Sequence, residues 1–275
     1  MKSEKQEVIN VDIIVPTLNA GRTLRRCLES LRSQSMPVQV IIVDGGSSDD
    51  TLNIARELAD RVLKSERRGF SCQRNLGAAG SRSDVLGFID ADMVLEDLVA
   101  EEVLGLISNG AAGVVVPEVS FGSTYWARVR AYERSFYEGV ESPEAARFIV
   151  NEKFVQAGGY DERLTSMEDF ALDRAIRKLG PIARTDSKIR HDEGALSFIS
   201  ACRKKARYAT GMVSYSRIYG RREFASFVLV RGYLRYPFRL MRKPLLGMGV
   251  IALKSGEAIA VSTQLLLEFQ SKASR

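Results

Sequence analysis

The sequence predicts an α/β fold in which a mostly parallel central sheet is followed by a helical carboxyl-terminal extension. The chain has 275 residues, of which 45% are hydrophobic and 27% are charged, as in globular proteins. Five apolar, β-branched runs alternate with helix-sized intervals: residues 11–17, 38–46, 61–65, 85–92 and 111–119. This alternation is typical of a parallel sheet with helices on both faces.

The intervals between these runs have the features of helices. In residues 24–31, apolar side chains recur at helical spacing and arginines occupy the opposite face. The second interval opens with SSDDT, residues 47–51, whose Ser and Asp side chains are good helix caps. The third contains QRNLGAAGS, residues 73–81, and the fourth is LEDLVAEEVLGLISNG, residues 95–110.

The charge is concentrated in one part of the chain. We expect the sheet domain over residues 1–200 and the extension over residues 201–275. Between Ala201 and Lys243 there are twelve Lys or Arg residues and one acid, Glu223, so this segment carries +11 and the remainder −5. A basic segment on a mildly acidic body predicts one surface that faces an anionic partner.

Cysteines and apolar runs bear on the cellular compartment. Cys27, Cys72 and Cys202 are widely spaced and form no Cys-x-x-Cys, which argues against a disulfide framework and a zinc site. The first ten residues lack the apolar region of a signal peptide, and no uncharged apolar run reaches the ~18 residues of a membrane span. We therefore expect a cytoplasmic protein, with peripheral binding to the cytoplasmic membrane face as an option.

Polar residues follow three of the expected strands at the point where each strand ends. They are Thr17 and Asn19, then Asp44 with Gly45 and Gly46, then Asp90 and Asp92. Ligands of open parallel sheets bind beyond the carboxyl ends of the strands. We therefore expect these groups to converge on one edge of the sheet.

Asp90 and Asp92 lie directly behind an apolar run, residues 85–89. In an extended chain, side chains alternate with period two, so both carboxylates would face the same way across Ala91. Two carboxylates placed in this way can share a divalent cation. The alternative is a solvated turn, in which acids are common.

Other candidate residues also have ordinary structural alternatives. Residues 43–51, VDGGSSDDT, combine a Gly turn with a helix N-terminus that favours anions, but they also fit a plain strand-to-helix turn. His191 is the single histidine, either a ligand or an ordinary residue that is at the surface or hydrogen-bonded. Glu168 and Asp169 begin an expected helix with Ser166 as its cap, where the helix dipole alone favours acids.

Five blocks, in order and spacing, resemble the family 2 glycosyltransferases: VPTLNAGRTLRRCLESL, VIIVDGGSSDDT, SCQRNLGAAGS, VLGFIDAD, and GGYDERL leading to MEDFALDRAIRKLG. They run from about residue 11 to about residue 193. The resemblance implies a glycosyltransferase A (GT-A) fold. It also implies transfer of a sugar from a UDP- or GDP-linked donor to a hydroxyl or lipid-phosphate acceptor, with inversion, in cell-envelope glycan or glycolipid synthesis.

The resemblance assigns donor contacts to individual residues. Pro16, Thr17 and Asn19 are similar in place to the first nucleotide-contacting loop of the family. Asp44, followed by the turn at Gly46, resembles the acid that reads the base, and Arg74 resembles a second contact to the nucleotide.

The resemblance also assigns residues to metal binding and to activation of the acceptor. Asp90 and Asp92 resemble the pair that supports the sugar nucleotide and holds Mg²⁺ or Mn²⁺ on its diphosphate. His191 is similar in placement to an additional metal or phosphate contact. Of the acidic pair Glu168 and Asp169, Asp169 resembles the general base that activates the acceptor.

The chain departs from the family pattern at Gly45, where the family often has a second acid. Because of this departure, the resemblance does not identify the base of the nucleotide in the donor. One competing class is a sugar-phosphate nucleotidyltransferase, which usually has a Gly-rich loop with Arg and Lys after the first strand. VPTLNAGRTL lacks that loop. The other is a catalytically silent membrane-binding protein with the same fold, which would bind lipid and show no metal-dependent nucleotide binding.

The extension interleaves Arg and Lys with Tyr and Phe over residues 203–243, a pattern typical of a membrane interface. The apolar tail, residues 244–269, is interrupted by Lys254 and Glu257, which favours helices lying on a bilayer over a span. One alternative is a basic helical subdomain that packs on the sheet. Single-stranded nucleic acid is the least favoured partner, because the catalytic blocks point to sugar nucleotides.

Overall fold

The computed structural model describes residues 9–137, 144–220, 222 and 237–273. Residues 223–236, the centre of the expected basic and aromatic segment, lie outside the described residues. The chain forms two compact units. The sheet unit comprises the chain up to Pro117, Ala146–Tyr160 and Ala171–Ile189. The helical unit comprises Glu118–Ala145, Asp161–Phe170 and the chain from Arg190 onward.

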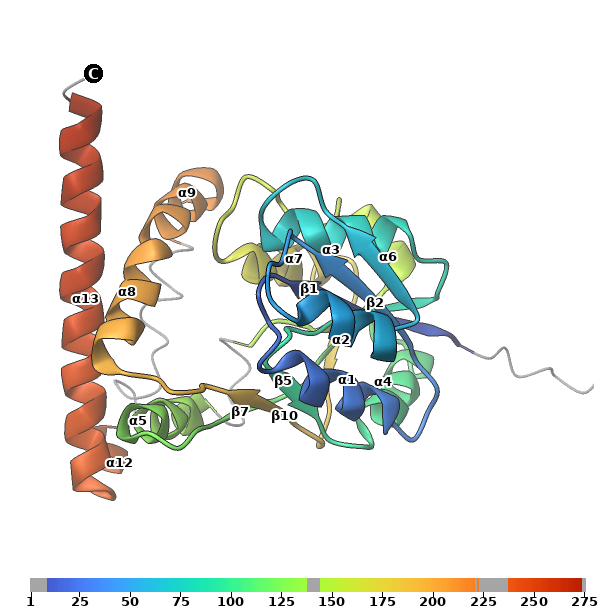
Figure 1. Cartoon of the computed structure of the whole chain (residues 1–275), viewed down its shortest axis with the longest axis horizontal. Helices are drawn as coiled ribbons and strands as arrows, with labels where there is room; N and C mark the ends of the chain where they lie inside the picture. Colours follow the sequence, from blue (N-terminus) through green and yellow to red (C-terminus); the bar gives the residue numbers. More distant parts are fainter. Residues whose placement is uncertain (1–8, 138–143, 221, 223–236, 274–275) are drawn as a thin grey trace, which may run out of the picture. The chain divides into compact units, whose positions relative to one another are not determined.

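A seven-stranded sheet forms the centre of the sheet unit (Figure 1). Its strands are β1 (Val11–Thr17), β2 (Gln39–Asp44), β3 (Arg61–Lys64), β4 (Val85–Phe88), β6 (Gly113–Val115), β8 (Phe148–Val150) and β9 (Ile182–Arg184). They lie in the order β3-β2-β1-β4-β8-β6-β9, and every pairing is parallel except those of β8. The predicted mostly parallel α/β fold is confirmed.

Helices cover both faces of this sheet. On one face lie α1 (Leu24–Arg32), α2 (Thr51–Leu58) and α4 (Val99–Ser108), and on the other lie α3 (Phe70–Ala79), α6 (Asn151–Gln156) and α7 (Glu168–Ile176) (Figure 1). The alternation of β1 accounts for this, because Ile13 packs in the cluster with α1, α2 and α4, and Ile14 in the cluster with α3, α6 and α7. Central strands buried on both faces explain the continuous apolar runs of the sequence.

Two of the predicted strands differ from the observed ones by more than their last one or two residues. The strand expected over residues 85–92 ends at Phe88, and the Met93 amide donates to the Asp90 carbonyl 3.0 Å away, which closes a turn. The run expected over residues 111–119 is divided into β6 and β7 (Glu118–Phe121) around Pro117, which has no N–H to donate to a sheet. A second sheet has the order β5 (Met93–Leu95), β10 (Ile189–Asp192), β7.

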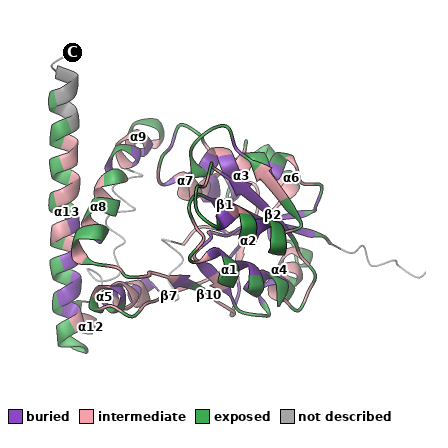
Figure 2. Ribbon diagram, in the orientation of Figure 1, coloured by how far each residue is buried: buried purple, intermediate pink, exposed green. Residues whose placement is uncertain are grey.

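The helical unit contains α5 (Tyr125–Arg134), α8 (Phe198–Arg207), α9 (Ala209–Tyr219), α12 (Pro237–Met241) and α13 (Pro244–Ala273). Its apolar core joins α5, α8 and α13 through Val129, Ala201, Val250 and Leu253, and Figure 2 shows buried residues along one part of α13. Among the described residues, α13 over Pro244–Leu267 is the one helix long and apolar enough to cross a membrane, by length and composition alone.

A closed ring of four charges ties α13 to α5. Arg130 contacts Glu133 at 2.9 Å and also pairs with Glu257, while Lys254 Nζ lies 2.9 Å from Glu133 and 3.0 Å from Glu257. Both carboxylates are only 5% exposed. Burial raises the pKa of Glu257, but the charges of Lys254 and Arg130 outweigh it and hold the pKa below its ordinary value. Each charge thus has two partners of opposite sign.

We expect Glu257→Gln to lower the free energy of unfolding by about 3 kcal/mol, because it leaves Arg130 and Lys254 buried with Glu133 alone. A group with a lowered pKa stabilises the fold above that pKa, so acid should destabilise the wild type more than the variant. Urea titrations at neutral and acidic pH measure both effects. The matched control is Glu57→Gln, which removes an exposed ion pair with Arg25 and should change little. Equal losses in the two variants would contradict this role for the ring.

Candidate active site

The ends of β1 and β2 are joined by the carboxylate of Asp44. The register of the sheet places Thr17 opposite Asp44, and Thr17 Oγ1 donates to Asp44 Oδ1 at 3.1 Å. The amides of Gly46 and Ser47 donate to Oδ2 at 2.9 Å each. Burial raises the pKa of Asp44, but these hydrogen bonds and that of the Ser47 hydroxyl outweigh it, so the pKa is below its ordinary value. Asp44 is therefore an ionised, 1% exposed anchor for the turn at Gly46.

The loop after β1 is fastened to the loop after β2. Asn19 has a positive φ of 53°, a conformation that Asn tolerates better than most residues. The side-chain oxygen of Asn19 accepts from the backbone N–H of Ser48 at 2.8 Å, and the backbone N–H of Asn19 donates to Ser47 Oγ at 2.8 Å. Asp49 accepts from the Thr51 amide at 3.1 Å, so an acid occupies the N-terminus of α2. This disfavours a phosphate at that position and leaves the loop suited to neutral donors and acceptors such as a base or ribose.

Three consecutive residues of α3 hold three parts of this edge in place. Gln73 Nε2 donates to the Thr17 and Val43 carbonyls at 2.8 and 2.7 Å. Asn75 bonds Tyr160 twice, donating to its carbonyl and accepting from its amide at 2.9 Å each. The predicted Gln-Arg-Asn block thus fixes the ends of β1 and β2 as well as the Gly-Gly-Tyr turn.

Arg74, between those two residues, pairs with Asp90. Arg74 Nη2 lies 2.7 Å from Asp90 Oδ1, and Arg147 Nη1 lies 3.4 Å from Asp90 Oδ2. The guanidinium of Arg74 also lies over the Tyr160 and Phe70 rings, with centroid distances of 5.2 and 5.7 Å. Arg74 is 5% exposed, so the structure places it as the support of Asp90. Its predicted contact with the nucleotide stays a prediction.

Asp90 and Asp92 occupy the turn between β4 and β5, so the expectation of an extended chain at these two residues is wrong. The turn lies near α1, where the Cys27 thiol contacts the Asp90 carbonyl at 3.7 Å. Burial raises the pKa of Cys27, and the charges of Asp92 and Asp90 raise it further, so this thiol stays neutral. Asp90 shares its oxygens with Arg74 and Arg147, and Asp90 and Asp92 are both half-buried.

A divalent cation fits this turn only if the ligand supplies part of its coordination. The described residues include no group of three His, Cys, Asp or Glu side chains that could hold a metal ion. Mg²⁺ in nucleotide sites is usually held by one or two carboxylates, with substrate phosphates and waters completing the shell. Asp92 supplies hard carboxylate oxygen of the required kind. The chain therefore fits a metal that arrives with a diphosphate.

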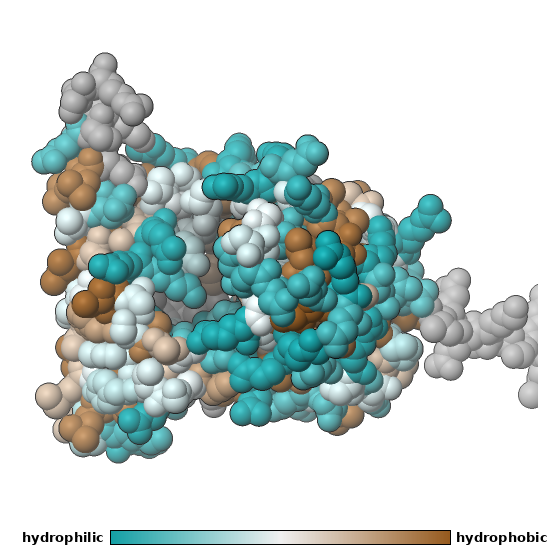
Figure 3. Space-filling model, in the orientation of Figure 1, coloured by the Kyte–Doolittle hydropathy of each residue, from teal (hydrophilic) through white to brown (hydrophobic). Residues whose placement is uncertain are grey.

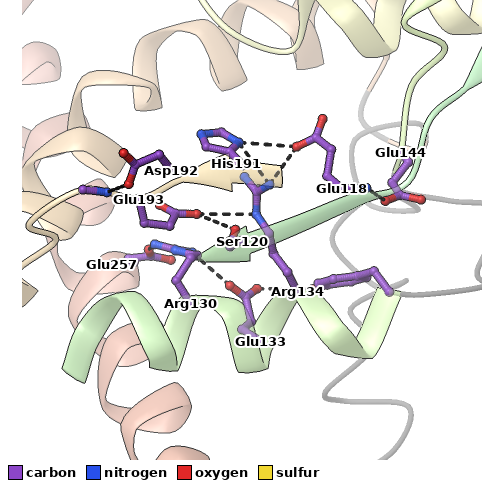
Figure 4. Close-up of polar contacts among 12 residues, drawn as sticks. Glu118, Ser120, Arg130, Glu133, Arg134, Glu144, His191, Asp192, Glu193 and Glu257 are labelled. Carbon is purple, nitrogen blue, oxygen red and sulfur yellow. Dashed lines mark hydrogen bonds and ion pairs between the residues drawn. The ribbon is translucent and has the colours of Figure 1, made fainter. Parts of the chain in front are cut away.

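His191 belongs to a polar cluster of the helical unit (Figure 4). Its Nδ1 lies 3.5 Å from Glu118 Oε2 and 3.2 Å from Arg134 Nη1, and Arg134 lies 2.7 Å from the same Glu118 oxygen. The residue is 8% exposed. The structure thus shows a hydrogen-bonded histidine, and its predicted part in a metal or phosphate site stays a prediction.

The predicted general base lies in the first turn of α7, after a loop that contacts Tyr208 and Tyr219. Asp169 Oδ1 accepts from the Phe170 amide at 2.9 Å at the start of α7, and both Glu168 and Asp169 are half-exposed. Ser166 is not the helix cap, because α7 begins at Glu168 and the Ser166 hydroxyl donates to the Tyr208 carbonyl at 3.0 Å. Tyr219 donates to Asp161 at 3.1 Å at the other end of the loop. These contacts fasten the loop that precedes the half-exposed acidic pair.

The remaining predicted contacts are Pro16 and Gly46. Pro16 is buried within β1, opposite Val43, and its predicted contact with the nucleotide stays a prediction. Gly46 is exposed with a positive φ of 96°, and no atom lies within 4 Å of where its Cβ would be. A ligand can therefore approach the backbone there. Sequence reasoning missed the contact of Arg147 with Asp90 and the two hydrogen bonds of Asn75 with Tyr160, because both join segments that are far apart in the sequence.

The mostly parallel sheet with helices on both faces is a fold of the GT-A type. A family model described as glycosyl transferase family 2 matches residues 12–161, more than half of the chain. The chain belongs to glycosyltransferase family 2.

Relatives and solved structures agree with this membership. Succinoglycan biosynthesis protein ExoA of Rhizobium meliloti (strain 1021) is 29% identical over 203 residues, 66% of this chain and 62% of that protein. Mannosyltransferase PcManGT from Pyrobaculum calidifontis, solved with GDP-Man and Mn²⁺, has a TM-score of 0.59 and 16% identity over 96% of this chain and 80% of that one. TarS 1-349 of S. aureus, in complex with UDP-GlcNAc, has a TM-score of 0.54 and 16% identity over 74% and 67%. The chain spans between 29% and 62% of the first curated relatives it matches.

The position of Gln73 explains the departure at Gly45. A Cβ on Gly45 would lie 3.1 Å from Gln73 Nε2 and 3.4 Å from the Thr17 carbonyl oxygen. The amide of Gln73 therefore takes the space that a side chain at residue 45 would need.

We expect Gly45→Asp to destabilise the protein, and to do so less in a Gln73→Ala background, where the space is vacated. The expected coupling free energy is about 1–2 kcal/mol. Urea unfolding of the four variants of the cycle measures it. Gly105→Asp serves as the control, since no atom lies within 4 Å of its Cβ position. Strict additivity of Gly45→Asp and Gln73→Ala would refute the explanation.

Proposed function

We propose that this chain transfers a sugar from a nucleotide-diphosphate sugar to a hydroxyl or lipid-phosphate acceptor, with inversion, in the synthesis of a cell-envelope glycan or glycolipid. The observation that carries the proposal is the single edge at which the ends of β1, β2 and β4 present the Asp44 turn, Asp90 and Asp92. Family membership supports it, as do the donors named for two structures of the same fold, UDP-GlcNAc and GDP-Man.

In this proposal the loops after β1 and β2 bind the nucleoside. Asp44 fixes the backbone of Gly46 and Ser47, and Asn19 fixes Ser48, so the edge is preorganised before the donor arrives. Asp90 is held by Arg74 and Arg147 and orients the turn that carries Asp92. Asp92 would hold Mg²⁺ or Mn²⁺ on the diphosphate. Such a cation neutralises the charge that develops on the departing nucleoside diphosphate.

Asp169 is proposed as the general base that removes the proton of an acceptor hydroxyl, which then attacks from the face opposite the leaving group and inverts the anomeric carbon. Glu168 precedes it on the same half-exposed turn and completes the acidic pair. An acceptor that is a lipid phosphate is already ionised and needs no base. The role of Asp169 therefore depends on the acceptor.

We also propose that the protein works at the cytoplasmic face of a membrane. The +11 charge between residues 201 and 243 supports this, because anionic lipid attracts clustered Lys and Arg. A nucleotidyltransferase is disfavoured by the family match. A catalytically silent membrane-binding protein remains the second candidate, and the next experiment separates it from a transferase.

We expect one nucleoside diphosphate among UDP, GDP, CDP and ADP to raise the midpoint of thermal unfolding, and to do so only with Mn²⁺. A ligand at about 100 times its dissociation constant adds about 2.7 kcal/mol to stability. Asp92→Asn should abolish the shift, while Asp97→Asn, an exposed acid beyond β5, should keep it. The absence of a shift with all four nucleotides would favour the catalytically silent alternative.

Asp169→Asn should preserve this metal-dependent shift and slow sugar transfer to a hydroxyl acceptor, or to water, by about 10²–10⁴-fold. Release of the nucleoside diphosphate from the donor measures the rate. Glu162→Gln is the matched control, because Glu162 is an exposed acid in the loop that precedes α7. An unchanged rate in Asp169→Asn would point to an acceptor that is already ionised and would remove the general base from the mechanism.

A further inference from the structure

We propose that the outward face of α13 lies flat on an anionic lipid bilayer and anchors the protein there. This inference deepens the proposed membrane association and rests on it. It names the surface that touches lipid, and it distinguishes a helix lying in the plane of the membrane from one that crosses it.

The outward face of α13 is defined by the exposed residues of Pro244–Leu267. Its large apolar side chains are Leu245, Met248, Ile251, Ile259, Leu266 and Leu267. They are spaced so that they share one side of the helix together with Ala252, Ser255, Ala258, Ser262 and Thr263, which are also exposed. No exposed residue between 244 and 267 is charged. Figure 3 shows hydrophobic residues recurring along this helix.

The charges that interrupt the apolar tail in the sequence point away from this face. Lys254 and Glu257 are 14% and 5% exposed and belong to the ring with Arg130 and Glu133 of α5. The sequence-based argument against a span, that Lys254 and Glu257 interrupt the apolar tail, therefore does not apply to the outward face. Glu133 and Arg130 of α5 compensate these two charges, so the outward face of α13 is an uncharged stripe several turns long.

The other side of α13 is fixed to its own unit. A Cβ on Gly249 would lie 2.5 Å from Val129, and one on Gly256 would lie 2.3 Å from Phe198, so the helix approaches α5 and α8 as closely as glycine permits. A crossing helix would draw α5 and α8 into hydrocarbon. These helices carry exposed cations at Arg128, Arg203, Lys204 and Arg207, which are costly there. The packing thus favours a helix lying in the plane of the membrane.

The exposed cations beside the outward face of α13 favour an anionic lipid surface as its partner over a second copy of this chain. Phe238 and Met241 of α12 are 82% and 73% exposed, and exposed Arg242 and Lys243 follow them immediately before α13. An apolar stripe that begins beside an exposed aromatic ring and cations matches the interface of an anionic membrane. A second copy would instead add its own exposed Arg242 and Lys243 beside this face, and cations repel one another.

Co-sedimentation of the full chain with vesicles tests the proposal. Vesicles of phosphatidylglycerol mixed with phosphatidylcholine should bind the wild type, and phosphatidylcholine vesicles should bind it more weakly. Met248→Glu, on the outward face, should reduce partitioning to the mixed vesicles by about tenfold or more, because it places a charge among the buried apolar groups. Val155→Glu is the matched control, since Val155 is equally exposed, at 70% against 68%, but lies in the sheet unit. Equal far-ultraviolet circular dichroism shows that both variants fold.

Each contrary outcome has a definite meaning. Binding by Met248→Glu at the wild-type level would assign the membrane contact to the basic segment alone and overturn the role of α13. Absence of wild-type binding to either vesicle at low salt would remove the membrane association itself. Metal-dependent nucleotide binding, measured on the same samples, shows separately whether the proposed transferase function stands.

Two further measurements decide the occupant and the geometry. A wild type that is dimeric by light scattering without lipid, with a monomeric Met248→Glu variant, would reassign the face to a second copy. Vesicle-bound protein should be released by alkaline carbonate, as expected for a helix lying on the surface. Retention in the vesicles would show instead that α13 crosses the bilayer.

Discussion

The ion pair between Arg74 and Asp90 is the contact on which the candidate site depends most. Arg74 lies under the turn after β4, packs on the Tyr160 ring, and is flanked by Gln73 and Asn75, which hold the ends of β1 and β2 and the Gly-Gly-Tyr turn. One helical segment thus sets the relative positions of loops far apart in the sequence. Rigid elements that fix polar groups before the ligand arrives reduce the ordering cost of binding and reaction.

This contact also separates the roles of the two acids. Asp90 shares its carboxylate between two arginines, so its charge is largely compensated within the protein. Asp92 lies in the same turn, and we propose its carboxylate as the donor to a hard cation. Charges are also compensated within the helical unit. There, residues of α5 pair with Lys254 and Glu257 of α13, so the exposed face of α13 carries no charge.

Periodicity in the sequence predicted the sheet, its two helical layers and the edge that carries Thr17, Asp44, Asp90 and Asp92. It failed where a turn decides the geometry, as at Asp90 and Asp92, because a period of two applies only to extended chain. It also could not show that Arg74 would pair with Asp90 or that Arg147 would join them, since such pairings depend on tertiary contacts. The inward direction of Lys254 and Glu257 was likewise invisible, because it depends on α5.

A structure with a nucleoside diphosphate and Mn²⁺ bound tests the central claim most directly. The account predicts the metal on the Asp92 carboxylate and the diphosphate oxygens, with the nucleoside against the loops after β1 and β2 and with Asp90 still paired with Arg74. A metal bridged by Asp90 after loss of the Arg74 contact would contradict the division of roles. A nucleotide bound away from this edge would contradict the account of the site as a whole.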